Sequence, residues 1–169
     1  MNNTTQKAVF TETQKFDRWW VWAILVLALI PNFIIIGNAI NNDIELTAKD
    51  VLFHNVIMAV VLVLFIIMKL KTEVTKSGIK FTYIPFYKRT IAWSEIASLQ
   101  LLKYGFVGYG IRLSFKYGTV YNTKGNKGLS IVLKNGEKLI IGTQKPEELK
   151  QIIENQNLEI EIISSNFLK

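Results

Sequence analysis

The chain has 169 residues, of which 50% are hydrophobic and 20% charged, so its composition is too apolar for a disordered tail. It contains no cysteine, which excludes disulfides, thiolate nucleophiles and Cys-ligated metal sites. Its one histidine, His54, excludes sites that need two imidazoles. We therefore predict a protein that is not an enzyme, with no catalytic residues, no metal site and no cofactor.

Two segments of the chain are strongly apolar. Residues 19–42 and 51–68 carry no charge, and 34 of their 42 positions are hydrophobic. At about 1.5 Å per residue, helices over these segments reach about 36 and about 27 Å, enough to cross a bilayer. We predict two transmembrane helices, at about 19–40 and 51–68, joined by a short extracytoplasmic loop. Pro31 is expected to kink the first helix without ending it.

The basic residues around these segments predict their orientation, because short flanks rich in Lys and Arg stay in the cytoplasm. The loop between the segments carries Lys49 with three acidic residues. The outer flanks are more basic, with Lys7, Lys15 and Arg18 before the first segment and Lys69, Lys71, Lys76 and Lys80 after the second. We therefore expect a multi-pass protein of the inner (plasma) membrane with both termini cytoplasmic, in which residues 1–18 form an N-terminal cytoplasmic segment.

Two polar residues, His54 and Asn55, lie within the second apolar segment. A polar group in this position can mark an ion path, which suggests an alternative function as a small oligomeric transporter or channel subunit. Neither segment contains an acidic residue that would serve a proton path. We favour hydrogen bonds across the hairpin to Asn32 or Asn38.

From Thr72 onward the pattern changes to short runs of β-branched and aromatic residues separated by turns. Asn135-Gly136 is a strong hairpin signal. Pro146 and the apolar spacing that follows it predict a closing helix. We expect an antiparallel, meander-like sheet closed by this helix, within a domain at 69–157. Strands are predicted over 73–75, 79–84, 89–92, 99–104, 111–115, 119–122, 129–134 and 138–141.

The C-terminal residues 158–169 form a separate tail in this prediction. Residues 158–163 alternate between apolar and charged side chains, as an edge strand does. This strand could add to the domain's own sheet or pair with another copy of the chain. We favour the first arrangement, because it needs no partner concentration.

Three short motifs occur in the order found in bacterial pleckstrin-homology-like (PH-like) domains. They are Trp93-Ser94-Glu95-Ile96, Gly108-Tyr109-Gly110-Ile111-Arg112, and Gly142-Thr143-Gln144-Lys145-Pro146-Glu147. The region from 72 to about 155 resembles that family. The resemblance implies an α+β, mostly β domain with a split antiparallel barrel capped by a C-terminal helix. It also implies a binding or scaffold role, and it supplies no catalytic residue.

The charge of the chain is concentrated after residue 68, where 16 basic residues face 8 acidic ones. We expect this region to contact anionic lipid headgroups or a protein partner, including another copy, and not nucleic acid. The alternatives are that the juxtamembrane lysines only set topology, that the aromatic side chains of 104–110 cover the open end of the barrel, and that Arg112 pairs with Glu95. The candidate binding residues are Lys80, Phe86, Tyr87, Lys88, Arg89, Tyr104, Phe106, Tyr109 and Arg112.

Overall fold

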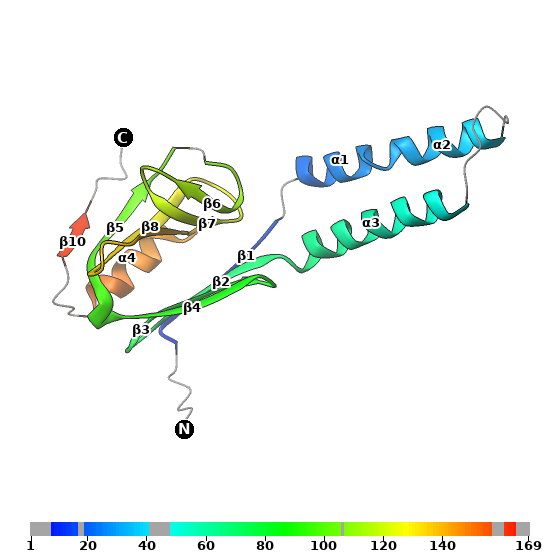
Figure 1. Ribbon diagram of the computed structural model, residues 1–169. Coiled ribbons are helices and arrows are strands. Elements are labelled where there is room, and N and C mark those ends of the chain that lie inside the picture. Colours follow the sequence, from blue (N-terminus) through cyan, green and yellow to red (C-terminus); the bar gives the residue numbers. More distant parts are fainter. Residues whose placement is uncertain (1–7, 17–18, 41–47, 106, 157–160, 165–169) are drawn as a thin grey trace, which may run out of the picture. The chain divides into compact units, whose positions relative to one another are not determined.

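The computed structural model describes residues 8–16, 19–40, 48–105, 107–156 and 161–164 (Figure 1). The chain divides into two compact units. Met1–Lys15 and Lys69–Lys169 form a β-rich domain, and Phe16–Met68 form a helical unit. The helical unit is therefore an insertion in the sequence of the β-rich domain.

The helical unit consists of α1 (Trp19–Leu27), α2 (Ile30–Ile40) and α3 (Ala48–Ile67). The prediction of one kinked helix over the first apolar segment is corrected, because α1 ends at Leu27 and a turn precedes α2. Pro31 lies in the first turn of α2, where its missing N–H group costs no intrahelical hydrogen bond. The proline therefore starts a second helix instead of bending the first.

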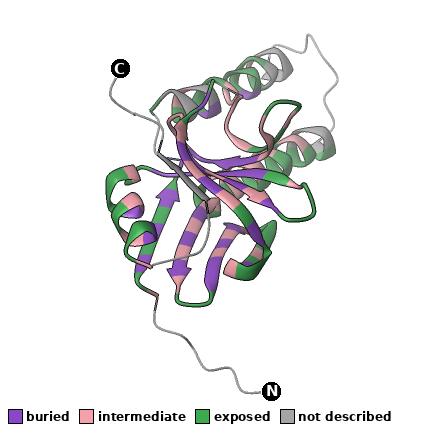
Figure 2. Cartoon of the chain, turned by 90° about the vertical axis from the view of Figure 1, so that its left-hand side faces the viewer, coloured by how far each residue is buried: buried purple, intermediate pink, exposed green. Residues whose placement is uncertain are grey.

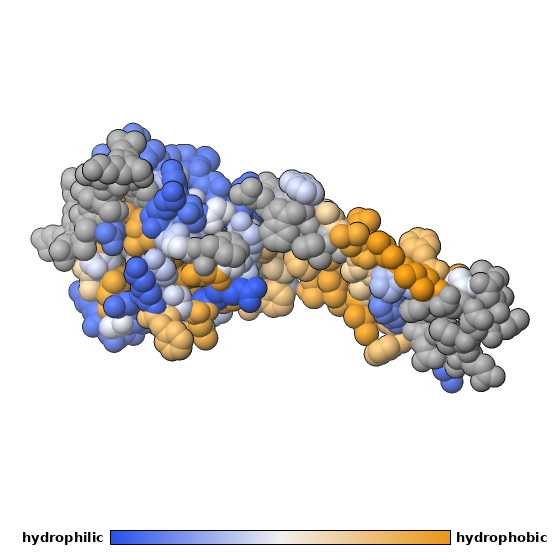
Figure 3. Space-filling view, turned by 90° about the horizontal axis from the view of Figure 1, so that it is seen from above, coloured by the Kyte–Doolittle hydropathy of each residue, from blue (hydrophilic) through white to orange (hydrophobic). Residues whose placement is uncertain are grey.

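Many apolar side chains of these helices are exposed, among them Phe33 at 74% and Phe53 at 70%, and Figure 3 shows apolar residues along this unit. Within the described ranges, no helix is both long and apolar enough to cross a membrane. His54 Nε2 is buried without a hydrogen-bond partner. The side chain of Asn38 is outside the described part of the structure, and the hydrogen bonds expected across the hairpin from His54 and Asn55 stay a prediction.

The first sheet of the β-rich domain is antiparallel, in the order β1-β2-β3-β4. Strand β1 lies in the segment 1–18 that the sequence predicts to precede the domain, but its backbone pairs with β2 along its whole length. The strand is short and four of its six residues are Thr, Glu or Gln, so it carries no apolar run. The strands are β1 (Phe10–Lys15), β2 (Lys69–Thr75), β3 (Gly78–Ile84) and β4 (Tyr87–Ala92).

The second sheet follows a short 3-10 turn, η1 (Trp93–Glu95), and has the order β10-β5-β8-β9-β7-β6. The predicted strands are confirmed, and the predicted Asn135-Gly136 hairpin joins β8 to β9. The strands are β5 (Ile96–Lys103), β6 (Gly110–Ser114), β7 (Gly118–Asn122), β8 (Lys127–Leu133), β9 (Lys138–Gly142) and β10 (Glu161–Ser164).

The expected all-antiparallel meander is wrong for this sheet. Strand β9 turns back from β8 and lies beside β7, so that β7 and β9 are parallel and the sequence neighbours β7 and β8 do not pair. Strand β10 pairs in parallel with β5, which confirms that the C-terminal tail adds to the domain's own sheet. Hairpin signals predict local reversals, whereas the order of strands depends on which apolar faces meet.

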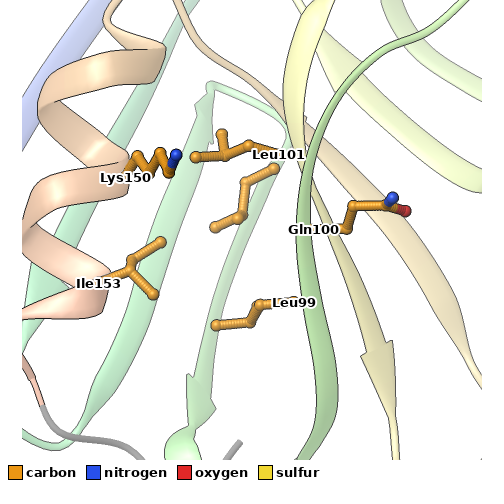
Figure 4. Close-up of a pocket in the computed structure, with 6 residues that line it drawn as sticks. Leu99, Gln100, Leu101, Lys150 and Ile153 are labelled. Atoms are coloured by element: carbon orange, nitrogen blue, oxygen red, sulfur yellow. The ribbon is translucent and has the colours of Figure 1, made fainter. Parts of the chain in front are cut away.

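Helix α4 (Pro146–Glu154) covers part of the second sheet and begins at the predicted proline. Its apolar residues Leu149 and Ile153 are buried. Figure 4 shows Ile153 opposite Leu99 of β5, beside a hollow of about 10 Å³ that holds no more than one water molecule. Strands β1 and β2 alternate between buried and more exposed residues, whereas β9 is buried from Leu139 to Gly142. The outer side of α4 is exposed (Figure 2).

Candidate functional site

The outer face of the four-stranded sheet is strongly basic. Side chains alternate between the two faces of a strand, and the other face carries the buried residues, such as Leu70 and Phe81. In the register of the strands, one acidic residue, Glu73, shares the outer face with five lysines. These are Lys15, Lys69, Lys71, Lys80 and Lys88.

The lysines are concentrated at one end of this sheet. Lys15 lies directly opposite Lys69, and the chain leaves the domain at Lys15 and returns to it at Lys69. Lys71 and Lys88 share one row across the sheet, two residues further along, which corresponds to about 7 Å. Like charges in facing positions repel each other, so this arrangement is favourable only beside a compensating negative charge.

Glu73 compensates the opposite end of the basic face. Its carboxylate accepts a hydrogen bond from Lys71 Nζ at 2.9 Å and forms an ion pair with Lys80 Nζ at 3.1 Å. The bond from Lys71 lowers the pKa of Glu73. No described carboxylate pairs with Lys15, Lys69 or Lys88, so the unpaired lysines of the basic face lie toward the end where the chain connects to the helical unit.

The predicted binding residue Arg89 lies on the other side of β4. Its guanidinium forms two hydrogen bonds with the carboxylate of Glu137, one of them 2.8 Å from Nη2 to Oε2. This bonding raises the pKa of Arg89 and lowers the pKa of Glu137. Arg89 therefore joins the two sheets and is not part of the basic face. Of the three basic residues predicted around the first hairpins, Lys80 pairs with Glu73, and Lys88 alone is exposed without an ion-pair partner.

The aromatic residues before Arg89 lie at the turn between β3 and β4. Phe86 is 58% exposed. The Tyr87 ring stacks on Tyr121 of β7, with 5.5 Å between the ring centroids and 15° between the planes. Burial, with a smaller contribution from Tyr87, raises the pKa of Tyr121 to about 12. The Tyr87 side chain therefore connects the two sheets while part of it faces solvent.

The glycine-rich loop after β5 does not present all its predicted contact residues. Tyr104 is buried and its hydroxyl accepts a hydrogen bond from Asn122 Nδ2 at 3.0 Å, which supports the alternative that an aromatic residue packs into the barrel. Burial raises the pKa of Tyr104. Phe106 lies outside the described residues. The carbonyl of Tyr109 accepts a hydrogen bond from Arg112 Nε at 2.9 Å.

Arg112 and Glu95 do not form the predicted ion pair. Arg112 bonds to the backbone of its own loop, and Glu95 Oε2 accepts a hydrogen bond from the Ala92 N–H group at 2.8 Å. Arg112 is exposed. In the part of the chain that the structure describes, no three His, Asp or Glu side chains come together as a metal site.

Lys15, Lys69 and Lys71 of the basic face are not among the predicted binding residues. The prediction uses Lys15 as a signal of membrane orientation, and it leaves Lys69 and Lys71 open between membrane orientation and contact with lipid. The alternation of Lys69, Lys71 and Glu73 was a local signal for a strand with a charged face. The contribution of Lys15 had no such signal, because it depends on the pairing of β1 with β2 across the whole helical insertion.

A mostly β domain with two sheets and a C-terminal helix has the architecture of a PH-like fold. The family model described as Bacterial PH domain matches residues 9–167, and the chain belongs to this family. The match includes β1, which agrees with its place in the sheet. No curated protein matched the chain.

Proposed function

We propose that this chain is an integral protein of the inner (plasma) membrane that presents a PH-like binding or scaffold domain to the anionic cytoplasmic leaflet. The observation that carries the proposal is the excess of five lysines over one glutamate on the outer face of the four-stranded sheet. The proposal includes no enzymatic step and places both termini on the cytoplasmic side.

The composition and exposure of the helical unit support its role as a membrane anchor. Large apolar side chains are exposed on all three helices, for example Val26 on α1, Phe33 on α2 and Phe53 on α3. Exposed apolar surface costs about 25 cal/mol per Å² in water, and soluble monomers rarely expose contiguous patches of this kind. Lipid around α1, α2 and α3 removes that cost.

The position of the lysines supports contact between the domain and anionic lipid. Each basic residue close to an anionic leaflet contributes about 1 kcal/mol. Lys71 and Lys88 lie about 7 Å along the strands from the row of Lys15 and Lys69, within the Debye length of about 10 Å at 0.1 M salt. Because the anchor keeps the domain at the surface, a weak contact of this kind is sufficient.

The anchor is tested by single cysteines, since the chain has none of its own. Cysteines introduced at Asn42 and at Lys145 are expected to lie on opposite sides of the membrane. An impermeant thiol reagent added to intact cells should modify position 42 and not position 145. Modification of position 145 alone would contradict the orientation, and release of the protein from membranes by alkaline carbonate would contradict the anchor.

The basic face is tested with the full chain in lipid nanodiscs and a fluorophore on Thr13→Cys. Thr13 is exposed and lies in the row of Lys71 and Lys88. Energy transfer to a headgroup-labelled lipid should be stronger with phosphatidylglycerol than with phosphatidylcholine alone, and should fall at high salt.

The matched variants for this experiment remove two positive charges each. Lys71→Gln with Lys88→Gln should reduce the energy transfer. Lys103→Gln with Lys134→Gln should not, because these two exposed lysines lie at the end of β5 and directly after β8. Equal energy transfer with both lipids at low salt would exclude lipid as the ligand of this face and leave a protein partner.

The alternative of a small transporter or channel subunit remains a prediction. It is favoured by one observation, the buried His54 Nε2 without a hydrogen-bond partner. Two spans per chain require an oligomer to enclose a pore. Light scattering of the purified protein in mild detergent distinguishes the two functions, because a monomer excludes the pore.

A further inference from the structure

An apolar strip runs along β6, the last strand of the six-stranded sheet. Ile111 and Leu113 lie on one face of this strand, and Phe115 follows in the turn after it. Ile111 is 39% exposed, Leu113 is 89% exposed and Phe115 is fully exposed. Aliphatic and aromatic side chains with this exposure indicate a surface that another molecule covers.

The strip continues onto the first sheet. Ile111 lies opposite Tyr121 in the β6–β7 pair, and Tyr121 stacks on Tyr87. Phe86, the neighbour of Tyr87, is exposed in the β3–β4 turn. This turn follows Ile84, which pairs with Lys69 in the row where the chain connects to the helical unit.

The charge around the strip has one sign. Residues 96–136 contain six basic residues and no acidic residue. Arg112 and Lys116 are exposed and alternate with the strip residues along the chain, and Lys88 follows Tyr87. A second copy of the chain would bring the same positive charge to this surface. An anionic surface complements it, because apolar side chains enter the acyl boundary while basic side chains meet the phosphates.

We propose that Phe86, Tyr87, Ile111, Leu113 and Phe115 enter the interfacial layer of an anionic bilayer, with Lys88, Arg112 and Lys116 at the lipid phosphates. This inference rests on the proposed function and adds to it a second element, the β6–β7 hairpin, that penetrates the membrane surface. In this proposal the lipid bilayer covers the apolar strip.

The test uses the full chain in nanodiscs and an environment-sensitive fluorophore at a single introduced cysteine. The positions are Leu113→Cys and Phe115→Cys, with Gln151→Cys on the exposed side of α4 as the control. With phosphatidylglycerol present, emission at 113 and 115 should shift to the blue, and nitroxide-labelled lipid should quench it. Position 151 should show neither effect, and discs of phosphatidylcholine alone should give a smaller shift at 113 and 115.

A charge variant tests the electrostatic part. Arg112→Gln with Lys116→Gln changes two exposed residues and should reduce the blue shift at position 115 in anionic discs. Near-ultraviolet circular dichroism checks that this variant keeps the native fold. An unchanged shift would overturn the assignment of these two residues to the lipid phosphates.

Three further outcomes would overturn the proposal. If the fluorophores at 113 and 115 remain in water while the probe at Thr13→Cys reports contact with anionic lipid, the inference fails and the proposed function stands. If the blue shift depends on the number of chains per disc and not on lipid charge, a second copy covers the strip. Failure of the chain to enter discs would remove both proposals together.

Discussion

Arg89 of β4 and Glu137, which immediately precedes β9, form a bidentate ion pair between residues 48 positions apart in the sequence. The pair joins the four-stranded sheet to the six-stranded sheet at a partly exposed position. Planar guanidinium and carboxylate groups match in this geometry, so the pair fixes the relative position of the two strands as well as contributing energy.

This ion pair predicts a pH dependence of stability. Its bonding lowers the pKa of Glu137 in the folded state, so its contribution is complete above the unfolded value of about 4.3 and is lost as the pH falls through the folded pKa. Solvent screening limits the contribution to about 1 kcal/mol. Glu137→Gln should therefore lower the free energy of unfolding at pH 7, and the difference from the parent chain should shrink at pH 3.

Urea unfolding of the purified chain at the two pH values measures this effect. Glu154→Gln is the matched control, because Glu154 forms a longer ion pair of 3.8 Å with Lys150 on the surface of α4. A difference for Glu137→Gln that is the same at pH 3 and pH 7 would show that its carboxylate charge does not contribute.

The buried carboxylate of Glu12 predicts that β1 is essential to the domain. Glu12 Oε2 accepts a hydrogen bond from Thr143 Oγ1 at 2.6 Å, and Oε1 accepts one from the Gln144 N–H group at 2.7 Å. Glu12→Ala leaves both donors without this acceptor and should cost about 2 to 3 kcal/mol in thermal unfolding. Thr11→Ala, at the neighbouring exposed position, should change stability little. Equal losses of stability for the two variants would show that these hydrogen bonds of Glu12 do not stabilise the domain.

The packing of α4 predicts that two residues adjacent in the sequence contribute differently to the stability of the domain. Leu149 is buried and Lys150 is partly exposed. Leu149→Ala should lower the free energy of unfolding by about 2 to 5 kcal/mol, and Lys150→Ala by less than about 1 kcal/mol. Equal denaturation midpoints for the two variants would show that α4 is not part of the core.

Two glycines with positive φ predict different responses to alanine. Gly118 has a φ of +72°, and a Cβ there would overlap the carbonyl oxygen of Lys138. Gly136 has a φ of +86° with open space around it. Gly136→Ala should cost about 1 to 2 kcal/mol from the backbone conformation alone, whereas Gly118→Ala should cost more. The two variants are compared by their thermal unfolding midpoints. A smaller loss of stability for Gly118→Ala than for Gly136→Ala would contradict the close contact between the backbones of β7 and β9.

Local signals in the sequence are sufficient to predict the separate strands and the closing helix of the domain. Runs of β-branched and aromatic residues predicted the strands from β2 to β9, Asn135-Gly136 predicted a hairpin, and Pro146 predicted the start of α4. Three short motifs led to the PH-like fold. These signals are readable because turn chemistry and side-chain periodicity depend on residues close together in the chain.

The order of the strands, and the face on which each charged side chain lies, depend on contacts between residues far apart in the chain. The sequence placed Lys88 and Arg89 in one binding group, but adjacent residues of a strand face opposite sides, so Lys88 lies on the basic face and Arg89 bonds to Glu137. The pairing of β1 with β2 brings Lys15 opposite Lys69 across the helical insertion. The alternation of polar and apolar side chains along a strand shows that its two faces differ. Which face is buried depends on the element that packs against it, and that element is formed by residues far away in the chain.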